Sequence, residues 1–335
     1  MHYPGAGMTD STGRNPLRSP GGFAVLFVSV ALLVSVSIGN SAVRDVENIR
    51  VLVPQTTAAL PFLQMAQTHA IADVDVHVET FTNHAQALSL LLRGDTDLIL
   101  SGTSQGWENR LDGSPIVMID TGVWGLASLV GKDPSIKSFT DLKGKKLALP
   151  FPGSPLDFQT RALLAHAGVD AEHDVSITYG PFAQSVERLL TGQIDAAALP
   201  EPVATSVVGK SGLVRLLEYS HAWAGLNNGD GRSPQVSLFS TRAFASSHRQ
   251  LLINLVDAWR ESSREISADP KNAARAFASE LGLGADVLGE ATRRTLLEVP
   301  GFDDNESKVL GYYRLVAPFL PGERRTLDAQ FFFVP

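Results

Sequence analysis

Hydrophobic and polar positions follow the same succession in two parts of the chain. Alternating apolar and polar residues predict a strand at 74–81 and another at 174–179. A ten-residue helix follows each strand and stops at a glycine, which adopts the left-handed conformation of a helix cap without strain. An aspartate then leads into an apolar run, at 98–100 and 196–199, short enough for a buried parallel strand. Each part therefore predicts a strand–helix–strand unit.

The two parts also share residues at matching positions. Residues 81–97 and 179–195 align without a gap at an offset of 98, and six of seventeen positions are identical. A weaker match at an offset of 96 pairs the apolar stretches 49–54 and 145–150, each closed by a proline. Any two strand–helix–strand units look alike, but the shared cap glycine and aspartate favour two related lobes. The identical pairs are Ala85/Ala183, Gln86/Gln184, Leu91/Leu189, Leu92/Leu190, Gly94/Gly192 and Asp97/Asp195.

This pattern predicts an α/β protein of two lobes, each a parallel-rich sheet flanked by helices with right-handed crossovers. Further strands are expected at 115–120, 121–130 and, after the turn-rich stretch 227–234, at 235–240. The tail then reads as helices at 247–267, 270–281, 284–297 and 304–318. With no sheet of its own, the tail is expected to pack back on the first lobe. Lobe one would comprise 43–125 plus 236–335 and lobe two 126–235, joined by two hinge crossings near 122–127 and 232–236.

The N-terminal residues 1–42 have the pattern of a signal peptide. Arg14 and Arg18 precede sixteen uncharged residues, 23–38, and small residues follow at 39–42. The apolar run is shorter than the roughly 20 residues of a membrane-crossing helix, although an uncleaved anchor remains an alternative. We therefore expect export to the periplasm or the cell exterior, with a mature chain that begins near Val43.

The amino-acid composition excludes several classes of function. The chain has 335 residues, 44% of them hydrophobic, and 28 Lys+Arg against 35 Asp+Glu give a net charge of -7. An acidic globular chain argues against a nucleic-acid partner, because basic side chains must neutralise phosphates. With Cys 0, disulfides, thiolate catalysis, zinc–cysteine sites and a lipid anchor on cysteine are excluded. The histidines show no metal-ligand spacing, and no phosphate-loop or dinucleotide motif is present, so neither a metal nor a cofactor is expected.

Several segments together resemble one protein family. The segment 138–150 (SFTDLKGKKLALP) is similar to the start of lobe two in periplasmic substrate-binding proteins of ABC transporters, of the nitrate, sulfonate and taurine type. Further matches follow in order at 163–169, 189–196 and 199–202, and lobe one matches at 91–97. The loop 55–61 departs from the family, which often has an aromatic or glycine-rich turn there, so it does not indicate the ligand.

The resemblance implies a type II periplasmic-binding-protein fold and a monomeric receptor without enzymatic activity. Such a receptor captures a small solute between its lobes by hinge closure and delivers it to an ABC permease, which works with a separate ATPase. It would meet the membrane only through that permease. The family favours sulfonate-like or oxyanion solutes. A ligand sensor of the same fold for a membrane signalling partner is an alternative that the sequence leaves open.

The topology nominates ligand-binding residues, because the carboxyl ends of parallel strands form the crevice of an open sheet. Small hydroxyl residues and glycines there leave backbone N–H groups free to bind an anion, although the same residues also serve as helix caps. Glu201, followed by Pro202, is a helix start, and a carboxylate facing the cleft would favour an amine or zwitterion. Trp124, in a crossing, could stack on a ligand or fill the core. The candidates are Gln55, Thr56, Thr57, Ser101, Gly102, Thr103, Trp124, Gly153, Ser154, Asp157 and Glu201.

One motif predicts an enzyme instead. Residues 102–106 (Gly-Thr-Ser-Gln-Gly) fit the G-x-S-x-G elbow of serine hydrolases, with Ser104 as the nucleophile. In a chain with 29 glycines such a match arises readily by chance, and no oxyanion-hole segment precedes it. The hydrolase is therefore kept only as an alternative to the solute receptor.

Overall fold

The computed structural model describes residues 47–319 and 329–335. Residues 44–335 form one compact unit. The predicted signal peptide lies outside the described residues. Within the described ranges, no helix combines the length and the apolar composition needed to cross a membrane.

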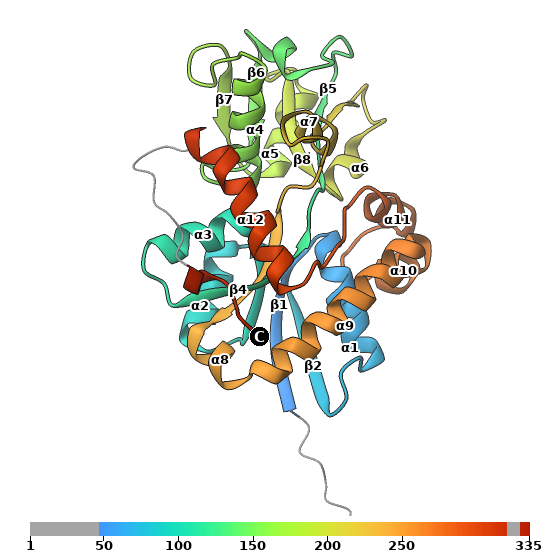
Figure 1. The fold of residues 1–335 in the computed structure, drawn as a ribbon. Coiled ribbons are helices and arrows are strands. Elements are labelled where there is room, and N and C mark those ends of the chain that lie inside the picture. The colour runs from blue at the N-terminus through green and yellow to red at the C-terminus, as the bar shows by residue number, and fades with distance from the viewer. Residues whose placement is uncertain (1–46, 320–328) are drawn as a thin grey trace, which may run out of the picture. The chain divides into compact units, whose positions relative to one another are not determined.

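Lobe one is built on a five-stranded sheet in the order β2-β1-β3-β10-β4, drawn in the lower half of Figure 1. Strands β1, β2 and β3 are parallel to one another, whereas β10 lies antiparallel between β3 and β4. The late strand β10 therefore completes a sheet whose other strands come from the first part of the chain. The bounds are β1 Glu47–Pro54, β2 Val74–Phe81, β3 Leu98–Gly102, β4 Ile116–Val123 and β10 Val236–Thr241.

Lobe two is built on a second five-stranded sheet, in the order β7-β6-β8-β5-β9. Strands β7, β6 and β8 repeat the parallel arrangement of β2, β1 and β3, and β5 lies antiparallel between β8 and β9. The expected α/β fold with two parallel-rich sheets is confirmed. The bounds are β5 Ala127–Gly131, β6 Lys146–Leu149, β7 Ser176–Tyr179, β8 Ala196–Pro200 and β9 Val214–Glu218.

The aspartate shared by the two lobes performs the same task in each. Asp97, just before β3, accepts the backbone N–H of Arg50 in β1 at 2.8 Å, and its own N–H returns a bond to the carbonyl of Arg50. Asp195, just before β8, accepts the backbone N–H of Lys146 in β6 at 2.7 Å, with the same return bond. In both lobes the aspartate therefore joins the start of the last parallel strand, β3 or β8, to the middle one, β1 or β6.

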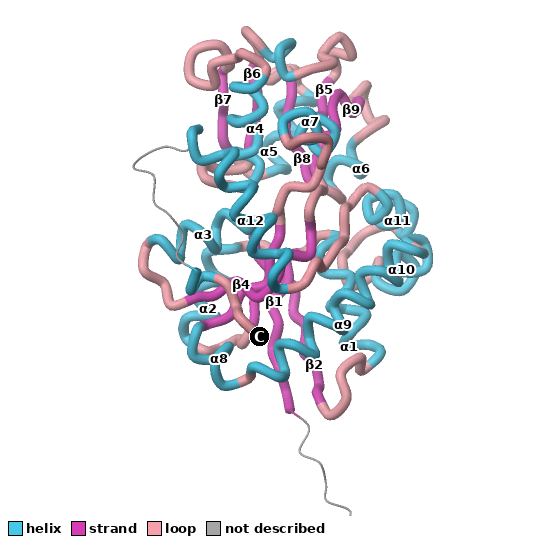
Figure 2. Tube along the Cα trace, in the orientation of Figure 1, coloured by secondary structure: helices cyan, strands magenta, loops and turns pink. Residues whose placement is uncertain are grey.

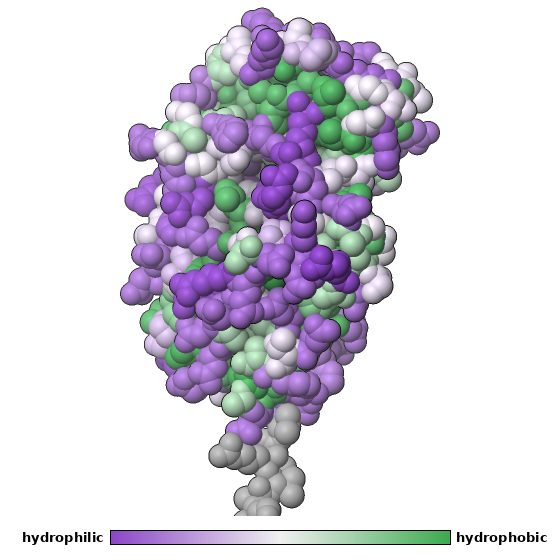
Figure 3. All heavy atoms as spheres, turned by 90° about the vertical axis from the view of Figure 1, so that its right-hand side faces the viewer, coloured by the Kyte–Doolittle hydropathy of each residue, from purple (hydrophilic) through white to green (hydrophobic). Residues whose placement is uncertain are grey.

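Helices cover both faces of each sheet. In lobe one, α1 and α9 pack on one face and α2 and α3 on the other. In lobe two, α4 and α7 pack on one face, while α5 and α6 pack on the other around Val130, Leu199 and Leu213. Figure 3 shows apolar side chains gathered over the upper lobe on the side where Figure 1 places α6. The helices are α1 Leu60–Thr68, α2 His84–Arg93, α3 Thr103–Leu111, α4 Pro155–His166, α5 Phe182–Leu190, α6 Val203–Val207, α7 Tyr219–Leu226, α8 Arg242–Ser247, α9 Arg249–Ala268, α10 Pro270–Phe277, α11 Ala285–Arg293 and α12 Phe302–Val316, with 3-10 turns η1 Thr57–Ala59, η2 Phe139–Leu142, η3 Ala317–Phe319 and η4 Ala329–Phe331.

Several boundaries differ from the expected ones. Strand β4 continues to Val123, and residues 124–126 form an irregular connection before β5, where the sequence predicted one strand over 121–130. The expected helix over 247–267 corresponds to α9, which begins at Arg249, and the short helix α8 before it was not anticipated. Strand β9 and helix α7 were not anticipated, because the stretch 203–226 mixes apolar and polar residues without a sustained period. The chain passes from the first sheet to the second between β4 and β5 and returns between β9 and β10.

The tail was expected to pack on lobe one, but its last long helix, α12, contacts both lobes. Figure 1 shows it running from the level of the lower sheet up to the helices of the upper lobe. Its Tyr313 stacks on Trp107 of α3, and its Tyr312 packs against Trp223 of α7. These aromatic side chains are buried, which joins the cores of the two lobes into one hydrophobic cluster.

Candidate functional site between the lobes

The carboxyl ends of the parallel strands of both sheets lead into loops at the centre of the molecule, as Figure 2 shows for β1 and β8. The lobes contact each other directly here. The hydroxyl of Ser104, in the first turn of α3, donates to the carbonyl oxygen of Gly153, just before α4, at 2.8 Å. A Cβ at Gly102 would lie 3.4 Å from Cγ of Pro155. The N-terminal ends of two helices, one from each lobe, therefore meet at this point.

The start of α4 is organised around Asp157. Ser154 is the N-cap and accepts the N–H of Asp157 at 3.1 Å, while the Asp157 carboxylate accepts the N–H of Gly153 at 2.9 Å. The same carboxylate accepts hydrogen bonds from Nε of Arg161 at 3.0 Å and the hydroxyl of Tyr179 at 2.9 Å. Asp157, which was a candidate ligand contact, is buried and uses its oxygens on protein donors. Its role in this arrangement is to hold the turn that carries Gly153.

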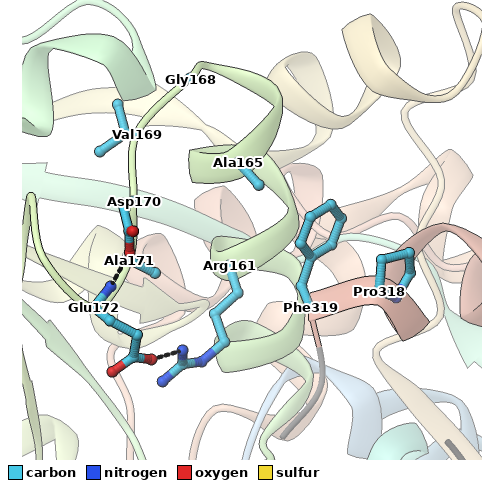
Figure 4. A pocket seen from close by; sticks show the side chains of 9 residues that line it. All are labelled: Arg161, Ala165, Gly168, Val169, Asp170, Ala171, Glu172, Pro318 and Phe319. Atoms are coloured by element: carbon cyan, nitrogen blue, oxygen red, sulfur yellow. Dashed lines mark hydrogen bonds and ion pairs between the residues drawn. The ribbon is translucent and has the colours of Figure 1, made fainter.

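A cavity of about 540 Å³ lies along the outer side of α4. Figure 4 shows Arg161 reaching from α4 to Glu172, with Phe319 on the opposite side of the cavity. None of the sequence-predicted contact residues lines it. Its relevance to the site is indirect, because Arg161 also binds Asp157.

In lobe one the candidates Ser101 and Gly102 are the last residues of β3, and Thr103 is the first residue of α3. The Thr103 hydroxyl lies 2.8 Å from that of Ser237, which lies 2.8 Å from that of Thr121, so these hydroxyls form a buried chain. The Ser101 hydroxyl lies 3.0 Å from Nδ1 of His84, and burial lowers the pKa of this histidine. Both residues line a cavity of about 170 Å³ between α2 and α3, and no other sequence-predicted candidate lines this cavity.

The candidates after β1 serve local structure. The Thr56 side chain caps η1 by accepting the N–H of Ala58, and the Thr57 hydroxyl lies 2.8 Å from that of Thr295, which follows α11. The Gln55 amide donates to the carbonyl of Leu281 at 3.3 Å, away from lobe two. These three side chains thus bind the end of β1 to the helices of the same lobe.

Glu201, at the end of β8, is fully buried in an ion pair. Its Oε1 lies 2.6 Å from Nη2 of Arg215 as an ion pair rather than an aligned hydrogen bond, and its Oε2 accepts the N–H of Thr205 at 3.1 Å. Burial raises the pKa of Glu201, although Arg215 opposes the shift. Arg215 also donates to Ser128, whose hydroxyl donates to Glu218 at 2.8 Å. The Glu201 carboxylate is therefore neutralised by Arg215, within lobe two.

On the same side of the molecule an ion pair joins the lobes. Arg294, next to α11 in lobe one, lies 2.9 Å from Glu218 of lobe two. Trp124, in the first crossing, is buried and donates its indole N–H to the carbonyl of Glu298 at 3.0 Å. Of the two roles considered for this tryptophan, the structure places it in the core.

A buried polar cluster at the second crossing was not anticipated. The Gln159 amide, on α4, donates to the hydroxyl of Ser233 at 2.9 Å, and the Gln235 amide donates to Gln159 at 3.1 Å and to Ser233 at 3.0 Å. The cluster ties α4 to the crossing. The turn-rich stretch before β10 was visible in the sequence, but no local signal paired it with Gln159.

The arrangement does not support the hydrolase alternative. Ser104 lies within the helix rather than on a strained turn, and its hydroxyl donates to a carbonyl oxygen, whereas His84 pairs with Ser101. Across residues 47–319 and 329–335, no group of three or more His, Asp or Glu side chains is placed to hold a metal ion.

Comparison with known proteins identifies the family. The profile of the NMT1-like family matches residues 107–281, slightly more than half of the chain, so the protein belongs to this family. No curated protein matches the sequence. The resemblance inferred from the sequence is confirmed in the fold, which the chain shares with solved structures whose names state an ABC transporter and a periplasmic sulphonate binding protein.

Solved structures share the fold at low sequence identity. An ABC transporter structure from Parabacteroides distasonis has a TM-score of 0.71 at 21% identity, covering 86% of this chain and 99% of that one. The periplasmic aliphatic sulphonate binding protein SsuA from Escherichia coli has a TM-score of 0.66 at 18% identity, covering 85% and 93%. The periplasmic nitrate-binding protein NrtA from Synechocystis has a TM-score of 0.60 at 16% identity, covering 74% and 70%.

Proposed function

We propose that the protein is an extracytoplasmic receptor that captures a small solute between its lobes by hinge closure and delivers it to an ABC permease. The observation that carries this proposal is the bond between Ser104 and Gly153, which joins strand-end loops of the two lobes where the ends of α3 and α4 meet. Closure around a solute requires contacts from both lobes, since a ligand shifts an equilibrium only by binding one state better than the other. Membership of the NMT1-like family supports the same role.

We propose a sulfonate-like group or another small oxyanion as the solute. Helix N-termini present unpaired N–H groups and a positive dipole end, which favour anions. The ion pair with Arg215 removes the argument that Glu201 raised for an amine or zwitterion. The fold relatives SsuA and NrtA, whose names state a sulfonate and nitrate, support this class.

A panel of solutes tests the function on residues 44–335, which form one compact unit. Taurine, alkyl sulfonates, nitrate, bicarbonate, pyrimidines, polyamines and amino acids would each be added in a thermal-shift assay. A ligand at 100 times its Kd adds about 2.7 kcal/mol, or roughly 5–10 °C in Tm at this chain length. We expect a shift with a sulfonate or small oxyanion, and no chemical change in that ligand. If no solute of the panel shifts the Tm of protein that was refolded to remove carried-over ligand, the proposed solute class is contradicted.

The contact between the lobes provides a second prediction. Ser104→Ala removes a hydrogen bond worth about 0.5–1.5 kcal/mol, which is expected to weaken solute binding roughly 2- to 12-fold if the bond belongs to the closed state. The control is Ser262→Ala, which removes a buried hydroxyl that donates to the carbonyl of Pro61 at 3.0 Å within lobe one. Both variants should lose similar stability in thermal unfolding, but only Ser104→Ala should lower the affinity measured by titration calorimetry. Equal affinities in the two variants would rule out a role for this bond in closure.

A further inference from the structure

Unpartnered polar atoms gather around α12. Six buried side-chain nitrogen or oxygen atoms in the described residues have no hydrogen-bond partner. Four of them lie on α12 or face it, namely Asn305 Oδ1, Tyr312 OH, Tyr313 OH and Trp223 Nε1. A buried donor or acceptor without a partner is unfavourable, so native structures rarely concentrate such groups in one place. Their accumulation at a single helix calls for a physical explanation.

The N-terminal half of α12 is attached to lobe one. The Asn305 amide nitrogen contacts the sulfur of Met118 in β4, and its backbone N–H bonds to the carbonyl of Gly301. Lys308 lies 3.4 Å from Glu298, in the segment that leads into α12. Farther along the helix, the Tyr313 ring stacks on Trp107 of α3, which also belongs to lobe one.

The contact of α12 with lobe two is different, because polar groups on both sides of it lack partners. The Tyr312 ring lies 5.0 Å, centre to centre, from the Trp223 ring, and both side chains are buried. The Tyr312 hydroxyl and the Trp223 indole N–H each have no hydrogen-bond partner. If this contact separates, water reaches both groups, so separation recovers two lost hydrogen bonds while it exposes apolar ring surface.

We infer that α12 is a releasable clasp: it stays on lobe one, and its contacts with lobe two, made by Tyr312 with Trp223 of α7 and by packing on α4, break when the lobes open. This inference rests on the proposed hinge closure. The unpartnered hydroxyl and indole N–H raise the free energy of the closed state, in which they are dry, relative to the open state, in which they are hydrated. They thereby keep the empty protein from closing, so that the solute decides the equilibrium.

The test removes the hydroxyl and keeps the ring. Tyr312→Phe in the full chain is expected to shift the solute-free protein about tenfold toward the closed state, equivalent to 1.4 kcal/mol. The radius of gyration from small-angle scattering should fall, and amide hydrogen exchange in α7 and α12 should slow. The matched control is Ser263→Ala, which removes an unpartnered buried hydroxyl from α9, inside lobe one. The control should raise Tm without a change in the radius or in exchange across the lobes.

Equal behaviour of the two variants, with a higher Tm and no change in the radius or exchange, would overturn the clasp and make Tyr312 part of a permanent core. A loss of stability in Tyr312→Phe would also overturn it, because the hydroxyl would then have a partner. Both measurements use protein without solute, so they remain decisive if the solute panel fails. If a solute of the panel binds but Tyr312→Phe behaves like the native protein, the proposed receptor function is supported and only the clasp is rejected.

Discussion

Arg215→Met is expected to destabilise the protein by about 3–5 kcal/mol, because it leaves the Glu201 carboxylate buried without a counter-charge. Glu201 is 1% exposed, and its Oε1 lies 2.6 Å from the guanidinium of Arg215. Burial already raises the pKa of Glu201, and loss of Arg215 removes the main opposing influence. The variant should therefore recover part of its stability as the pH falls and the carboxyl becomes protonated. Urea unfolding at pH 5 and pH 8 measures both effects.

The double variant Glu201→Gln, Arg215→Met provides the control. A neutral amide can still accept the N–H of Thr205, which bonds to Glu201 in the native protein. The double variant is expected to be more stable than Arg215→Met alone, and the difference in stability between the two variants should shrink as the pH falls, because the other titrating groups are present in both. Equal instability of the two variants would show that Arg215 stabilises the protein by packing and by its hydrogen bonds to the hydroxyls of Ser128 and Thr205, and not by its charge.

Between pH 5 and pH 8, Asp120 is expected to lower the stability of the protein as the pH rises. Its carboxyl is fully buried in β4 and accepts the N–H groups of Thr121 at 2.7 Å and Gly301 at 3.1 Å. Burial raises the pKa of Asp120 to about 7 from an ordinary value of 3.8. The folded state thus keeps a proton that the unfolded state releases near pH 4. The stability that this proton gives declines above pH 4 and is lost once the pH passes 7, in total about 4 kcal/mol.

Asp120→Asn isolates this effect from the other titrating groups. His84, whose pKa burial lowers, acts in the opposite direction below about pH 6.5, since protonation favours its unfolded form. Because His84 is present in both proteins, its contribution cancels in the difference between variant and native curves. We expect that difference to move in favour of the variant by about 2.5 kcal/mol between pH 5 and pH 8. Parallel stability curves would show that Asp120 titrates near its ordinary value.

The repeated units could be predicted from the sequence because their determinants are local. The alternating strands, the cap at Gly94 and the aspartates Asp97 and Asp195 are separated by few residues, and the structure gives each aspartate the same bond to the middle parallel strand of its lobe. The class of protein followed from the same segments. Strand β9 was missed because it lies at a sheet edge and its residues are only partly buried, which leaves little alternation to detect.

The candidate site was predictable only as a set of loops. Topology placed Ser104 and Gly153 at strand ends, and the structure brings them together. The partners that occupy Glu201, Asp157 and Thr57 come from distant parts of the chain, and no spacing pattern connects Glu201 with Arg215 or Thr57 with Thr295. The residue type and its place after a strand therefore indicate which loop a residue belongs to. Whether its polar atoms are free depends on long-range packing, which the sequence does not display.

Because β10 comes late in the chain, the sheet of lobe one can be completed only after the strands of lobe two have been synthesised. This strand fills the gap between β3 and β4, yet more than a hundred residues of chain separate it from them. During synthesis the strands of lobe two are made one after another. The sheet of lobe one becomes continuous only when β10, which ends at Thr241, has been made. Until then β3 and β4 expose unpaired edges, the feature that most invites aggregation in an incomplete sheet. Lobe two can therefore mature first, and a chain truncated before β10 would present a finished lobe two beside an open sheet.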